Sequence, residues 1–242
     1  MFELLAGNSY VFFGIVLLAS ILSTAFGIGG FVLIPLFALV YGPKAGVGII
    51  TLYFLFQNVT KIAAFREHID WNVSKRMIYW LIPGAIAGAY ALSLIPDTIL
   101  NKVLGIFILL YLANDVFKLI PKEHYDAALL PLMSFLYGAM SCLTGAGTVI
   151  KGPLLTSIGL RKESYNGTYA LTSFFVNTPK LIVYVSTSVI TFAAILQSLP
   201  LLLVSIAGTY IGKHLLKRVS ENAFYYFLNI LFALSAIVLI FQ

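Results

Sequence analysis

Apolar runs close to twenty residues long recur along the whole chain, and this feature limits its possible folds more than any other. A helix needs about 20 predominantly apolar residues to cross the hydrocarbon core of a membrane. Of the 242 residues, 60% are hydrophobic and 10% are charged, whereas about a quarter of the residues of soluble globular proteins are charged. The sequence therefore predicts an all-α polytopic membrane protein that is embedded in the lipid bilayer and has no separate soluble domain.

The remaining composition argues against several other classes of protein. The formal charge of +6 is not arranged as a basic patch interleaved with exposed aromatics, so no nucleic-acid partner is expected. The single cysteine, Cys142, excludes an intrachain disulfide and a CxxC site. The three histidines fall in loops, and no nucleophile with a base lies at membrane depth. We therefore expect no metal, no cofactor, no catalytic residue and no enzymatic activity. The only early charge is Glu3, so no cleaved signal peptide is expected.

Four short motifs occur twice along the chain, in the same order. The matching pairs are 26–30 (FGIGG) with 144–148 (TGAGT), Gly42 with Gly159, 56–61 (FQNVTK) with 175–180 (FVNTPK), and 84–88 (GAIAG) with 208–212 (GTYIG). Such an ordered recurrence indicates an internal duplication. We predict two repeats, residues 1–122 and 123–242, that together form one integral membrane domain.

Each repeat contains four apolar segments, and the first of them is unusually long. It contains about 30 residues, or about 45 Å as a single helix, which is too long for one simple crossing. It also contains the glycine motif and, after it, a proline. Such a segment either crosses the membrane once or enters, breaks at the glycines and returns to the same side. The segments are 10–41, 46–66, 76–95 and 99–117 in the first repeat, and 129–159, 164–186, 190–213 and 222–241 in the second.

The distribution of lysine and arginine separates these two arrangements, because cytoplasmic loops carry most of the positive charge. Re-entrant hairpins with an outer N-terminus place ten basic residues in the cytoplasm and two outside, whereas eight plain crossings give at best seven against five. We therefore predict hairpins, three full crossings per repeat, an inverted second repeat, and both termini on the outer side of the inner (plasma) membrane. The ten residues are Arg66, Lys75, Arg76, Lys118, Lys122, Arg161, Lys162, Lys213, Lys217 and Arg218.

A helix break inside a membrane is tolerated where it lines a polar cavity or is buried in protein. Glycines leave backbone N–H groups bare, and a half-helix that starts after them directs its positive end into the gap. Residues 31–41 and 149–158 are the expected half-helices. Inverted repeats with broken helices are typical of secondary transporters, whose substrate lies near the midplane. Two such helix N-termini that face each other predict an anion site.

The intramembrane charges agree with an anion site. Three lysines, Lys61, Lys151 and Lys180, lie outside the loops, and no carboxylate lies at mid-span. Ionisable residues within a membrane usually serve function, although Lys61 and Lys180 can alternatively snorkel to the membrane surface. Likewise, Asn58 and Asn177 can form hydrogen bonds between helices, and the threonine and serine hydroxyls of the second repeat can bond to carbonyls of their own helices. The predicted substrate-binding residues are Gly27, Gly29, Gly30, Asn58, Lys61, Thr144, Gly145, Gly147, Thr148, Lys151, Thr172, Ser173, Asn177 and Lys180.

Two stretches, AFGIGGFVLIPLFALVYG and SCLTGAGTVIKGPLLTSIGL, resemble the paired glycine-rich signatures of the TauE/SafE sulfite exporter family. The later GTYALTSFFVNTPK resembles the asparagine-bearing helix that follows the second signature. The resemblance covers essentially the whole chain and implies a bacterial or archaeal inner-membrane transporter of sulfite, sulfoacetate and other small sulfur-containing or organic anions. By position, it assigns the glycine motifs to 27–30 and 145–147. The second motif departs from the family pattern, because Thr148 adds a hydroxyl and Lys151 a charge.

The sequence therefore predicts a secondary transporter that exports a small sulfur-containing anion, such as sulfite or a related sulfonate, by alternating access. An anion channel and an exporter of another small organic anion remain alternatives. An intramembrane enzyme and a membrane scaffold are disfavoured, because neither needs duplicated breaks with buried lysines. The GxxxG faces at 84–88 and 208–212 serve packing within the chain or between the chains of a homodimer.

Overall fold

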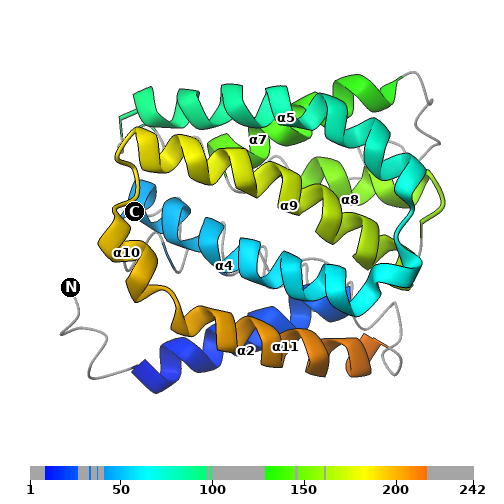
Figure 1. Ribbon diagram of the computed structural model, residues 1–242, viewed down its shortest axis with the longest axis horizontal. Coiled ribbons are helices and arrows are strands. Elements are labelled where there is room, and N and C mark those ends of the chain that lie inside the picture. Colours follow the sequence, from blue (N-terminus) through cyan, green and yellow to red (C-terminus); the bar gives the residue numbers. More distant parts are fainter. Residues whose placement is uncertain are drawn as a thin grey trace.

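The computed structural model describes residues 9–26, 33, 37, 41–96, 99, 129–144, 147–160 and 162–216 (Figure 1). Within these ranges the protein is helical and has no strand, which confirms the all-α prediction. The predicted segments 99–117 and 222–241 lie outside the described residues. The elements are α2 (Ser9–Phe26), α4 (Pro43–Phe65), the 3-10 turn η1 (Arg66–His68), α5 (Trp71–Leu94), α7 (Leu130–Thr144), α8 (Thr148–Ser157), α9 (Lys162–Ser186), α10 (Phe192–Gln197) and α11 (Pro200–Leu216).

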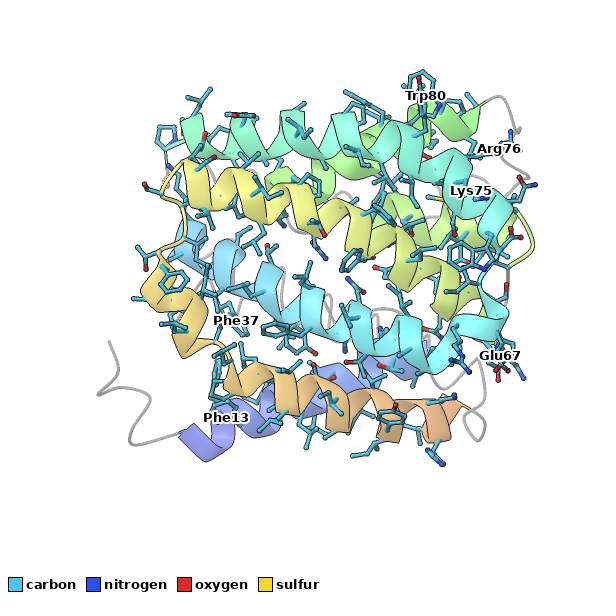
Figure 2. The ribbon with its side chains drawn as sticks, in the orientation of Figure 1. Phe13, Phe37, Glu67, Lys75, Arg76 and Trp80 are labelled. Atoms are coloured by element: carbon cyan, nitrogen blue, oxygen red, sulfur yellow. The ribbon has the colours of Figure 1, made fainter. Side chains whose placement is uncertain are left out.

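The surface of the bundle is apolar, as expected for a protein in lipid. Within the described ranges, the stretches Lys44–His68 and Trp71–Leu94 are helices long and apolar enough to cross a membrane. Large apolar side chains such as Tyr79, Leu94 and Leu203 are mostly exposed, and Figure 2 shows Trp80 on the outer face of α5. So many exposed apolar side chains are unfavourable in water and favourable in hydrocarbon.

The helices are arranged as a central pair with one helix pair on each side (Figure 1). In the centre, α4 packs against α9. On one side α5 packs against α7, and on the other α11 packs against α2. The repeat alignment pairs α2 with α7, α4 with α9, and α5 with α11, so the two outer contacts involve equivalent helices. In both of them, the glycine-bearing helix of one half packs against the first helix of the other half.

The glycine pairs permit these two outer contacts. A Cβ atom on Gly84 or Gly88 would lie 2.1 Å from a main-chain carbonyl oxygen of α7, that of Phe135 or Ala139 respectively. A Cβ atom on Gly208 would lie 2.3 Å from the side chain of Ser20 in α2. Only hydrogen fits in such spaces, so the close packing expected of these glycines is confirmed, and it occurs within the chain.

Helix α8 turns back along α7 after the second glycine motif (Figure 1). Gly147 lies against Ser141 of α7, and Lys151, one turn further along α8, bonds to Tyr137, one turn earlier in α7. The two helices are therefore antiparallel. The described half-helix, Thr148–Ser157, agrees with the predicted 149–158. In the first repeat, most of the corresponding segment lies outside the described residues.

The seventh predicted segment, 190–213, differs from the structure, which divides it into α10 and α11. Thr191 begins α10, and its hydroxyl accepts a hydrogen bond from the Ala194 N–H. Pro200 begins α11 because it lacks an N–H group and its fixed φ suits the first turn of a helix. Only two residues, Ser198 and Leu199, separate the two helices, and so short an interruption is not visible in hydropathy alone.

One end of the bundle gathers basic residues. Asp70 caps α5 by accepting bonds from the Asn72 and Val73 N–H groups, both at 3.0 Å, and its own N–H donates to Thr168 of α9. Lys213 of α11 donates to the Ala64 carbonyl of α4 at 2.6 Å. These bonds bring the ends of four helices together, and Figure 2 shows Glu67, Lys75 and Arg76 there. Five of the ten residues predicted to be cytoplasmic lie at this end: Arg66, Lys75, Arg76, Lys162 and Lys213.

Candidate functional site

Lys151 lies in the first turn of α8, directly after the second break, and its side chain is completely buried. Its Nζ donates hydrogen bonds to the Tyr137 hydroxyl at 2.7 Å, to the Tyr169 carbonyl at 3.0 Å and to the Ser173 hydroxyl. It also lies 3.4 Å from the centroid of the Tyr169 ring and 4.5 Å from that of the Tyr137 ring, within the range of cation–π attraction. We call Tyr137, Lys151, Tyr169 and Ser173 the Lys151 cluster.

Positive charge in the Lys151 cluster is not balanced by any described carboxylate. The hydrogen-bond partners of Lys151 are two hydroxyls and a carbonyl. Lys61 of α4 acts electrostatically on Lys151, and it has the same sign. Burying an ammonium group without a counter-charge costs several kcal/mol. An anion bound here would supply that counter-charge, so the arrangement favours anionic ligands.

Lys61 and Lys180 are also buried, with exposed fractions of 1% each, so neither snorkels to the surface. The Lys61 Nζ donates to the Ser23 carbonyl at 2.7 Å and to the Ser23 hydroxyl at 2.9 Å. The Lys180 Nζ donates to the Ser141 carbonyl at 3.0 Å. Both ammonium groups therefore bond inward, to the first helix of their own half.

These two contacts are equivalent under the repeat. Ser23 and Ser141 each lie four residues before the first glycine of their motif, in the last turn of α2 and of α7. The last four carbonyls of a helix have no partner within it, and that end of the helix dipole is negative. Lys61 and Lys180 therefore each bond to a carbonyl in the last described turn of α2 or α7.

The Lys151 cluster, in contrast, exists only in the second repeat. Leu33 lies at the same distance from its glycine motif as Lys151, and it is completely buried. The glycine motifs likewise pair Tyr137 with Ala19, and the 56–61 and 175–180 motifs pair Tyr169 with Ile50; both partners are also buried. At these three positions the predicted second repeat therefore has polar side chains where the first has apolar ones.

The other predicted site residues fall into four groups. Asn58 and Asn177 are buried on α4 and α9, the two central helices. The Thr172 hydroxyl donates hydrogen bonds to the carbonyls of Thr168 and Tyr169. It therefore bonds to its own helix, which is one of the two alternatives that the sequence allowed. Gly147 precedes α8 as its N-cap residue. Gly27, Gly29, Gly30 and Gly145 lie outside the described residues, as do the side chains of Thr144 and Thr148.

Four residues of these contacts were not predicted from the sequence: Ser23, Tyr137, Ser141 and Tyr169. The two serines share a spacing of four residues from the glycine motifs, which is a signal that the sequence contains. The two tyrosines carry no comparable signal, because aromatic residues are frequent in membrane helices. Tyr169 and Ser173 are four residues apart and so lie on one face of α9.

Comparison with known protein families agrees with this geometry. The family model described as sulfite exporter TauE/SafE matches residues 12–239, from the start of α2 to near the end of the chain. The chain belongs to the TauE/SafE family. As a TauE/SafE protein it is a membrane transporter for anions, and its apolar helices fit that class, as does the lack of a carboxylate among the described residues around Lys151. No curated protein and no solved structure matches the chain.

Proposed function

We propose that this TauE/SafE protein exports a small sulfur-containing anion, sulfite or a related sulfonate, across the inner membrane by alternating access. The observation that carries the proposal is the Lys151 cluster, where a completely buried ammonium group at a helix break is surrounded by hydroxyls and no described carboxylate. An oxyanion accepts hydrogen bonds from all of these donors, and charge-assisted bonds are the stronger ones.

In this proposal the anion lies beside Lys151 and Ser173, between the central helices and the two breaks. The Asn58 and Asn177 amides line the path, and Lys61 adds positive potential from the opposite half. Backbone N–H groups at the glycine motifs and the hydroxyls of Thr144 and Thr148 complete the coordination. Direct contact of Lys180 with the anion has less support, because its Nζ is engaged by Ser141.

We further propose that residues 1–122 and 123–242 are inverted repeats. The equivalent contacts of α5 with α7 and of α11 with α2 support this, as do the equivalent bonds of Lys61 and Lys180. An anion held between inverted repeats becomes accessible to each side in turn as the helices rock. A membrane potential that is negative inside favours export of a monoanion by about 2.3 kcal/mol per 100 mV.

The first test of this function is counterflow of radiolabelled sulfite in proteoliposomes. We expect saturable counterflow, in which unlabelled sulfite inside the vesicles accelerates entry of the label. Flux that neither saturates nor shows counterflow would indicate a channel. Absence of sulfite flux in folded protein would refute the substrate, and a panel of sulfonates and other organic anions would then be the next measurement.

The proposed orientation places the basic end of the bundle in the cytoplasm and both termini outside. Cys142 is buried, so single added cysteines can be labelled against a low background. In intact cells we expect a membrane-impermeant maleimide to label Ser186→Cys, at the far end of α9, and to leave Glu67→Cys unlabelled until the cells are lysed. The two positions are exposed and lie at opposite ends of the bundle. The reverse pattern would invert the orientation, and equal labelling would contradict it.

A further inference from the structure

Lys61 and Lys180 occupy the part of a broken helix that other transporters use for a coupling cation. In broken-helix transporters, carbonyls at the C-terminal ends of half-helices coordinate sodium ions or protons, while half-helix N-termini hold the anionic part of the substrate. Here the corresponding carbonyls, at Ser23 in α2 and Ser141 in α7, each accept a bond from a buried ammonium group. At both positions a lysine side chain of the protein occupies the place where such transporters bind a coupling cation.

Oxygen atoms of α2 face the buried ammonium group of Lys61. Its Nζ contacts the carbonyl and hydroxyl oxygens of Ser23. The Ser23 hydroxyl donates in turn to Oε1 of Gln57 at 3.0 Å, and the Gln57 amide nitrogen donates to the carbonyl and hydroxyl of Ser20. The amide nitrogen is thus directed towards Ser20, and the two described partners of the ammonium, the Ser23 carbonyl and hydroxyl, are both oxygens without a negative charge.

We infer that Lys61 and Lys180 act as tethered cations in place of coupling sodium ions, so that anion transport by this protein is independent of sodium. The inference rests on the proposed carrier function, since it concerns what that carrier is coupled to. Both lysines have this role because their contacts are equivalent, and it separates them from Lys151, whose bonds go to two hydroxyls and a carbonyl on neighbouring helices. They are positioning residues, which hold the last described turns of α2 and α7 through these bonds.

Replacement of sodium in the transport assay is the direct test. We expect the rate of anion counterflow in wild-type proteoliposomes to change by less than about twofold when sodium is replaced by potassium or choline on both sides, because no sodium site needs to be filled. A strong dependence of wild-type flux on sodium would overturn the inference. Absence of any anion flux would instead count against the proposed function, and the second test then decides the inference alone.

The second test measures sodium binding without transport. In detergent, wild type is expected to show the same melting temperature in sodium chloride and choline chloride. Lys61→Ala empties the oxygen-lined site, so sodium is expected to raise the melting temperature of this variant, by about 3 °C at a concentration near ten times the Kd. Lys213→Ala is the matched control, because Lys213 also donates to a main-chain carbonyl but lies at the end of the bundle.

Each result of this second test supports or overturns the inference. A sodium-specific shift in Lys61→Ala but in neither wild type nor Lys213→Ala supports it. A sodium-specific shift in wild type, or none in Lys61→Ala, overturns it. If Lys61→Ala does not fold, Lys180→Ala tests the equivalent position in the same way, because the Ser141 carbonyl loses the corresponding ammonium.

Discussion

Replacing Lys151 with methionine is expected to lower the rate of anion transport at least about hundredfold while leaving the protein folded. Methionine has a similar length and no charge, so the substitution removes the ammonium group of the Lys151 cluster and its three hydrogen bonds. Bonds to charged groups contribute about 1.5–3 kcal/mol each, so the loss of two bonds between the ammonium and the proposed anion exceeds the roughly 2.7 kcal/mol that a hundredfold change requires. Replacing a buried charge with an apolar side chain is frequently neutral or stabilising, so folding is expected to persist.

The first repeat offers a matched control for this substitution. Leu33→Met introduces the same residue at the equivalent buried position, where one apolar side chain replaces another, and it is expected to change the flux less than threefold. Counterflow in proteoliposomes and a size-exclusion profile in detergent check both variants. Normal flux in folded Lys151→Met protein would remove Lys151 from the anion site.

Gly88→Val is expected to destabilise the protein by about 3 kcal/mol or more and to abolish transport. A Cβ atom at this position would lie 2.1 Å from the carbonyl oxygen of Ala139 and 2.8 Å from its carbonyl carbon and Cα. These are main-chain atoms of α7, which cannot rotate away as a side chain can. Valine therefore forces α5 and α7 apart, and α7 carries both Tyr137 and Ser141.

Gly14→Val in α2 is the control, because a Cβ atom there meets no atom within 4 Å. Its melting temperature in detergent is expected to remain close to that of wild type, apart from the small helix propensity difference between glycine and valine. A fall of similar size in both variants would show that the cost of valine comes from the helix itself and not from the contact between α5 and α7.

The sequence was sufficient for the class of fold, the family and the second break. Long apolar runs dictate membrane helices, and the glycines and proline after residue 144 identify where one of them turns back. It also singled out Lys61, Lys151 and Lys180, because ammonium groups are rare in such runs. All three lysines are buried in the structure, as expected for intramembrane residues. Their role in transport stays a prediction.

The contacts of these lysines could not be predicted from the sequence, for two physical reasons. Every residue has a main-chain carbonyl, so the residue types at positions 23 and 141 do not indicate that their carbonyls accept bonds from lysines. Ser23 and Ser141 therefore look like ordinary members of apolar runs. Tyr137 and Tyr169 look like the aromatic residues that face lipid, and only the packing of α7, α8 and α9 shows that they surround Lys151. The equal spacing of the two serines from the glycine motifs was the one available clue.

Two helix contacts, α5 with α7 and α11 with α2, each join the first half of the chain to the second. They limit which parts of the molecule can move as rigid units. Helix α5 is joined to α7 by main-chain contacts that leave no room for a Cβ atom, and α11 is joined to α2 in the same manner. A motion that preserves both interfaces must carry α5 with α7 as one block and α11 with α2 as the other, with α4 and α9 between them (Figure 1). Blocks of this kind would cut across the sequence halves, because each contains one helix from either half of the chain.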